Sequence, residues 1–175
     1  MSNDTLDNDT IIRSIESIPD IVKQFIRSKV ATYQPNMYDL FDEFNNHVTG
    51  LFQLLDQLVI KYNMTSHFKM LANYKQLIKH AINCKRSLVI DKYTLVTLEY
   101  AADILDGRED VFLNMTFNDT QGKLDGNEFS IIKCDNFKVL WKQLTEDERT
   151  QIHTRMISMT TTSLIFVVKT MQSQQ

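Results

Sequence analysis

The chain has 175 residues, of which 43% are hydrophobic and 10% aromatic, enough to bury the core of one globular domain and too apolar for a disordered chain. Only four glycines and two prolines are present, which argues against a β-rich fold with many tight turns. The net charge of −3 argues against a general nucleic-acid-binding surface, and two widely separated cysteines argue against a disulfide scaffold.

The first third of the chain begins with an acidic, polar stretch that predicts a disordered tail over residues 1–9, unlike a secretory signal or a transit peptide. Apolar residues at helical spacing then predict a helix over about 19–33, with Pro19 in its first turn and Pro35 beyond its end.

The longest purely apolar run of the chain, 164–168, is far shorter than the roughly 18 residues of a membrane-spanning helix. We therefore expect no membrane span.

The strongest pattern of the sequence follows Asn36, a residue type that caps helices. Its apolar positions are separated by alternating steps of four and three residues: Met37, Phe41, Phe44, Val48, Leu51, Leu55, Leu58 and Tyr62. Neighbouring apolar residues widen this stripe beyond the narrow seam of a two-stranded coiled coil. The pattern favours a central bundle helix packed inside the domain, and an intermolecular seam is the alternative.

The remaining elements are also predicted to be helical, over 65–84, from Ser87 to about Leu105, over 109–117, across the apolar positions of 131–144, and from about Glu146 to Met171. Asp106-Gly107 provides a helix stop, and Thr145 with Glu148 forms a capping box. The β-branched stretch 160–168 has low helix propensity, so it is either held helical by burial or partly a strand.

Together these patterns predict an all-α fold. We expect a single-domain bundle of about six to seven helices over residues 10–172, with one internal polar loop near 118–128 that contains Gly122 and Gly126.

No pattern of catalytic or metal-binding residues emerges. His80 and Cys84 lie one helical turn apart, but zinc needs about four ligands and no second pair accompanies them. The 118–128 segment fails the calcium-loop template, because Lys123 and Leu124 would occupy its fifth and sixth positions. Phosphate-binding loops and nucleophile elbows are absent from the sequence. We expect a protein that is not an enzyme and has no cofactor or metal.

Positive charge concentrates in residues 61–92, which carry seven basic side chains and one acidic side chain. The candidate interaction surface consists of Lys75, Lys79, Lys85, Arg86 and Lys92. These cations are either a solvated face that complements a helix dipole or a contact for an acidic protein partner. A nucleic-acid or phospholipid surface is the third alternative, although aromatic residues are not interleaved with the cations as a stacking platform would require.

Several segments form an ordered series of motifs along the chain. They are Phe41-Asp42-Glu43-Phe44, the helix from Tyr93 to Leu105, the turn 106–113, and Leu140-Trp141-Lys142-Gln143-Leu144 followed by Thr145-Glu146-Asp147-Glu148. Over about 38–166 this series resembles small all-helical proteins of large nucleocytoplasmic double-stranded DNA viruses. The sequence departs from that pattern at Asp106-Gly107, where Gly-Asp is expected, and at 116–119, where Asp-Tyr-Ser often follows.

The resemblance implies a non-enzymatic viral structural protein, a minor capsid or virion-assembly subunit that acts through helix-face contacts. It implies that the partners are other protein subunits, copies of itself or capsid proteins, and that there is no small-molecule substrate. The expected locations are the virion and, during assembly, the host cytoplasm. The alternative function is a host-directed helical module that binds a partner helix, as apoptosis regulators do.

Overall fold

The computed structural model describes residues 16, 20, 23–24, 27–28, 37–69, 71–114 and 135–173. Its helices in this part of the chain are α3 (Met37–Lys61), η1 (Thr65–Phe68), α4 (Leu71–Cys84), α5 (Leu88–Thr97), η2 (Leu98–Tyr100), α6 (Ala101–Leu105), α7 (Glu109–Asn114), α9 (Asp135–Gln143) and α10 (Glu146–Ser173). All regular structure in these ranges is helical, which confirms the predicted all-α class. None of the helices described here has a stretch apolar enough to cross a lipid bilayer.

Some predictions fall on residues outside these ranges. They are the tail 1–9, most of the helix 19–33, the loop 118–128 and the first apolar positions after 130. The described members of the 19–33 segment, which include Asp20 and Arg27, are helical. The single-domain prediction over 10–172 remains a prediction.

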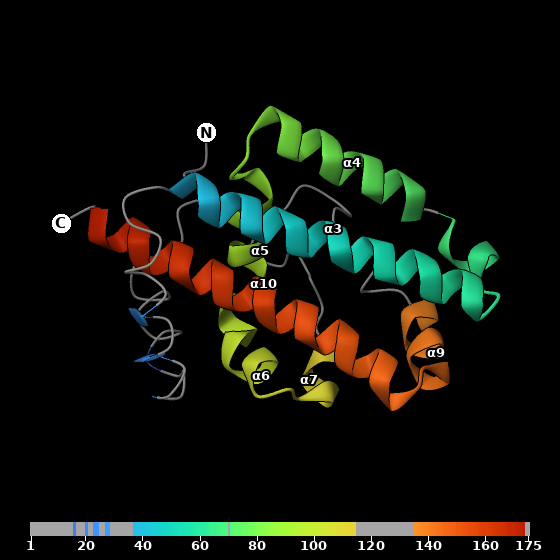
Figure 1. Ribbon diagram of the computed structural model, residues 1–175. Coiled ribbons are helices and arrows are strands. Elements are labelled where there is room, and N and C mark those ends of the chain that lie inside the picture. The colour runs from blue at the N-terminus through green and yellow to red at the C-terminus, as the bar shows by residue number, and fades with distance from the viewer. Residues whose placement is uncertain are drawn as a thin grey trace.

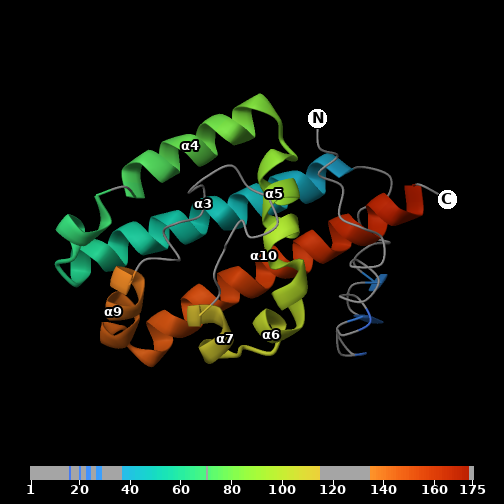
Figure 2. The same cartoon turned by 180° about the vertical axis from the view of Figure 1, so that it is seen from behind.

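Two long helices, α3 and α10, lie side by side and run in opposite directions through the length of the molecule (Figure 1). The shorter helix α4 lies along α3, while α6 and α7 lie below α10 and α9 lies near one end of the pair. Seen from behind, α5 crosses the seam between α3 and α10 (Figure 2). The central pair therefore supplies the surface on which the other helices pack.

The predicted apolar stripe of α3 lies in this core. Phe44, Val48, Leu51, Leu55 and Leu58 are all at most 7% exposed. Because these side chains are covered by other helices of the same chain, the structure supports the internal-core interpretation of the stripe over the intermolecular seam.

The end of α3 is fixed by local backbone geometry. Asn63 has a φ of +59°, the left-handed conformation that asparagine tolerates better than most residues. The amide of Met64 then donates to the carbonyl of Val59 at 2.8 Å, which closes the helix end. This turn directs Met64, only 4% exposed, into the core.

Two segments predicted as single helices are each divided in the structure. The 65–84 segment consists of η1 and then α4, and the 87–105 segment consists of α5, η2 and α6. The buried residues of the second segment belong to two groups. Tyr93 on α5 and Ile104 near the end of α6 pack in one group, whereas Leu98 in η2 and Ala101 pack in another.

We call these two groups of buried residues the large cluster and the small cluster. In the part of the chain that the structure describes, the large cluster contains 19 buried residues, among them Phe44, Leu51, Tyr93, Trp141 and Ile152. The small cluster comprises Leu40, Leu98, Ala101, Leu164, Ile165 and Val167. Because α3 and α10 contribute to both clusters, the two helices connect them.

The last helix confirms two predictions. Thr145 Oγ1 accepts from the Glu148 amide at 3.2 Å, and a Glu148 carboxylate oxygen accepts from the Thr145 amide at 2.9 Å, the reciprocal bonds of a capping box. The β-branched stretch 160–168 is helical throughout and mostly buried. Burial therefore outweighs the low helix propensity of this stretch.

Candidate functional site

An apolar groove of about 300 Å³ lies between α4 and α5. Its lining residues are Leu77, Ile78, His80, Ala81, Cys84, Leu88, Val89 and Lys92. Leu77 is 47% exposed, and it lies beside the partly buried Ile78 and Ala81 in the groove wall. The groove thus offers apolar surface to a binding partner.

The short connection between α4 and α5 sets the position of the two groove walls. The Lys85 amide donates to the Ala81 carbonyl at 3.0 Å, and the Leu88 amide donates to the Lys85 carbonyl at 3.0 Å. The side-chain amide of Asn45, a buried residue of α3, donates to the carbonyl of Arg86 at 3.0 Å. This bond ties the connection to the central helix and keeps the two walls in place.

The five basic residues of the predicted interaction surface lie in different surroundings. Lys75 forms an ion pair with Asp56 of α3, and Lys85 lies 3.5 Å from a carboxylate oxygen of Asp91. Lys92 lines the groove and Lys79 is exposed outside it; neither is paired with a carboxylate among the described residues.

Arg86 lies at the α4–α5 connection. Its Nε is 3.9 Å from an Asp42 carboxylate oxygen, and its guanidinium lies 5.1 Å from the centre of the Tyr38 ring. The geometry therefore places Lys92 alone of the five at the groove. Three of the other four have their charge partly balanced by carboxylates of the same chain.

The His80–Cys84 pair lies in the groove wall, with 3.4 Å between Cys84 Sγ and His80 Nε2. Within the described ranges no three His, Cys, Asp or Glu side chains are grouped closely enough to hold a metal ion. The apolar residues of the groove lie in segments that the sequence predicts to be helical. The pattern gave no signal that they line a groove, because helical spacing alone does not show which apolar positions stay uncovered.

A second, polar groove of about 440 Å³ lies between α3 and α10. It is lined by Gly50, Gln53, Leu54, Gln57, Thr150, Gln151, Thr154 and Arg155. None of these residues belongs to a sequence pattern that predicts a function. The local signal that could have found the groove is Gly50, a glycine inside a predicted helix.

The end of the central pair opposite the small cluster holds a compact polar network. The carboxylate of Glu148 accepts hydrogen bonds from Lys61 Nζ at 2.7 Å and from the Tyr62 hydroxyl, in addition to the capping bond from Thr145. These donors, Lys61 foremost, lower the pKa of Glu148 to about 2. The network joins the end of α3 to the start of α10.

The amino-acid sequence of the chain is similar to that of a protein of a giant virus. The chain is 33% identical over 174 residues to the uncharacterized protein R465 of Acanthamoeba polyphaga mimivirus, an alignment that covers 97% of this chain and 94% of the mimivirus protein. The chain therefore belongs to the family of this viral protein, which confirms the resemblance to proteins of large nucleocytoplasmic DNA viruses. No family model and no solved structure matches it.

Proposed function

We propose that the chain is a non-enzymatic structural protein of a large DNA virus, a minor capsid or assembly subunit that binds another protein of the particle along the α4–α5 groove. The groove is the observation on which this proposal rests. The occupant we infer is an amphipathic segment of a capsid protein, with apolar side chains for the groove and a carboxylate for Lys92.

Three features support a protein occupant. The groove is largely apolar and open to solvent along Leu77, so a partner segment can cover it without threading into a cavity. Lys92 provides a cation at the groove without a described carboxylate partner. A nucleic-acid surface fits less well, because Lys75, Lys85 and Arg86 already face carboxylates of the chain. The viral relative supports a role in a virus.

The test compares two substitutions of equal chemistry and similar exposure. Leu77→Glu places a charge in the groove, and Val139→Glu places one on α9, where Val139 is 49% exposed and does not line the groove. We expect L77E to reduce incorporation into purified particles about tenfold or more, since it buries a charge against apolar surface, and V139E to incorporate normally.

Quantitative mass spectrometry of purified particles measures the copy number of each variant. Absence of the wild-type chain from particles would contradict the virion role. Equal incorporation of L77E and wild type would contradict the groove contact. If a purified host protein with an exposed amphipathic helix binds the wild type but not L77E, the host-directed alternative replaces the virion role.

A further inference from the structure

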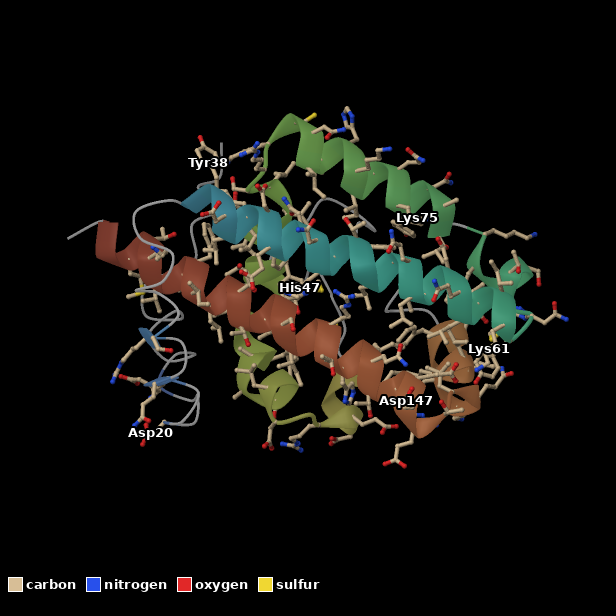
Figure 3. All side chains as sticks on the ribbon, viewed as in Figure 1. Asp20, Tyr38, His47, Lys61, Lys75 and Asp147 are labelled. Carbon is tan, nitrogen blue, oxygen red and sulfur yellow. The ribbon has the colours of Figure 1, made fainter. Side chains whose placement is uncertain are left out.

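The polar groove between α3 and α10 contains a positively charged side chain held in a defined place. Figure 3 shows His47 at the seam of these two helices, on the face that Figure 1 presents to the viewer. Arg155 of α10 reaches this seam, where its Nη1 lies 3.4 Å from Nδ1 of His47. His47 Nε2 in turn lies 3.9 Å from a carboxylate oxygen of Glu43. Glu43 is therefore separated from Arg155 by the imidazole ring.

Gly50 is what allows Arg155 to lie across α3. A Cβ atom on Gly50 would lie 2.7 Å from the guanidinium carbon of Arg155 and 2.8 Å from its Nη1. Glycine in the middle of a 25-residue helix is unfavourable by intrinsic propensity, and here it leaves the space that the guanidinium fills. The helix thus has a notch in which the end of the Arg155 side chain lies.

Among the described polar side chains of this groove, Arg155, Gln53 and Gln57 keep hydrogen-bonding capacity, whereas Gln151 donates to Asp147 at 2.8 Å. A guanidinium has five N–H donors. Among the described residues, that of Arg155 contacts one imidazole nitrogen, that of His47, and no carboxylate lies in ion-pair contact with it. Gln53 and Gln57 add carboxamide donors at the same groove. The hydroxyls of Thr150 and Thr154 are already committed to carbonyls of their own helix, at 2.9 and 2.8 Å.

We propose that this groove is a binding site for an oxyanion, a carboxylate or a phosphate group, held by the guanidinium of Arg155 with the carboxamides of Gln53 and Gln57. The planar fork of a guanidinium matches two oxygens of either group. The volume of about 440 Å³ accommodates such a group together with the residue or molecule that carries it. The site lies on different helices from the α4–α5 groove and stands independently of the function proposed above.

The test titrates the full chain with inorganic phosphate and, separately, with acetate, at constant ionic strength set by chloride. Side-chain N–H signals of Arg155, Gln53 and Gln57 are followed by nuclear magnetic resonance. We expect saturable shifts confined to the groove. Saturation by phosphate alone assigns a phosphate ligand, and saturation by acetate as well assigns the carboxylate class.

Two variants and one control test the geometry. Arg155→Gln removes the fork, and we expect it to weaken binding about tenfold or more. Gly50→Ala puts a methyl group where the guanidinium lies, so the guanidinium must shift, and we expect weaker binding than in the wild type although alanine favours the helix. Arg108→Gln removes an exposed arginine that pairs with Asp103 outside the groove, and it should bind as the wild type does.

Circular dichroism of each variant tests whether it remains folded. The proposal is overturned if neither anion gives saturable shifts in the wild type. It is also overturned if R155Q and G50A both retain wild-type affinity.

Discussion

Glu148 connects the end of α3 to the start of α10, because its carboxylate accepts from Lys61, Tyr62 and the Thr145 amide. Glu148→Gln keeps the shape of the side chain and removes its charge. We expect the melting temperature to fall by roughly 2–4 °C, since charge-assisted hydrogen bonds become weaker neutral ones. Glu146→Gln, a neighbouring exposed carboxylate outside the network, is the control and should change the melting temperature far less.

The carboxylate of Glu148 also predicts that the stability of the fold depends on pH. The pKa of Glu148 is lowered to about 2 from an ordinary value of 4.5, so folding favours the ionised form. Its contribution to stability is complete above pH 4.5 and disappears as the pH falls toward 2. We expect the difference in urea midpoint between wild type and E148Q to shrink over this window. A difference that stays constant from pH 6 to about 2 would show that the charge of Glu148 does not stabilise the fold.

A pair of buried hydroxyl groups, one of them in the large cluster, predicts that the losses of stability caused by two substitutions will not add. The hydroxyls of Tyr93 and Thr160 lie 2.9 Å apart, and Tyr93 is 4% exposed. Thr160→Val leaves the tyrosine hydroxyl with one fewer partner, at a cost of about 1–3 kcal/mol. Adding Tyr93→Phe removes that hydroxyl, so we expect the double variant to be less destabilised than the sum of the two single variants. Chemical denaturation of all four proteins measures the difference, and strict additivity would contradict the pairing.

At the scale of elements, α10 shows how tertiary burial sustains a helix of poor intrinsic propensity. Thr150 and Thr154 are exposed, and their hydroxyls donate to carbonyls four residues earlier. Replacing both with alanine should raise the unfolding free energy, by about 0.5 kcal/mol for each, because alanine favours the helix and no burial is lost. Thr160→Ala, at a fully buried position, should lower it. Urea midpoints measure both effects, and a loss of stability in T150A/T154A would show that the hydroxyl bonds outweigh propensity.

The elements that the sequence predicted well are those set by local interactions. The 3.5-residue repeat of apolar residues predicted α3, and the capping box of Thr145 and Glu148 predicted the start of α10. Gly107 has a φ of +70°, as the stop after α6 requires. The divisions between η1 and α4 and at η2 were not predicted, because the spacing of apolar residues does not show where a helix is interrupted. Leu77 and Gly50 carried no local sign of a groove, because both grooves form only where two helices meet.

For the whole molecule, the charge of −3 is arranged so that several cations of the 61–92 segment face carboxylates from other segments. Lys61 pairs with Glu148, Lys75 with Asp56 and Arg86 faces Asp42. The concentration of positive charge in the sequence therefore does not persist as a uniform positive surface. We infer that any electrostatic selectivity for partners comes from single cations at the grooves, Lys92 and Arg155, rather than from net charge.

The long central pair also predicts how the molecule unfolds. The small cluster lies where α3 begins and α10 ends, whereas Trp141 lies in the large cluster, and it is the one tryptophan of the chain. Leu40→Ala removes a fully buried side chain from the small cluster and should cost about 2–5 kcal/mol. Because α3 and α10 run through both clusters, we expect this loss to reach Trp141 at the other end of the pair.

Tryptophan fluorescence reports the large cluster, and far-ultraviolet circular dichroism reports all the helices. We expect L40A to shift both denaturation midpoints by the same amount, which is the behaviour of one cooperative unit and of the single domain predicted from the sequence. Leu77→Ala, at a half-exposed position of the α4–α5 groove, is the control and should shift them little. If L40A moved the dichroism midpoint and left the fluorescence midpoint in place, the two clusters would be separate folding units, and continuity of the long helices would not be enough to couple them.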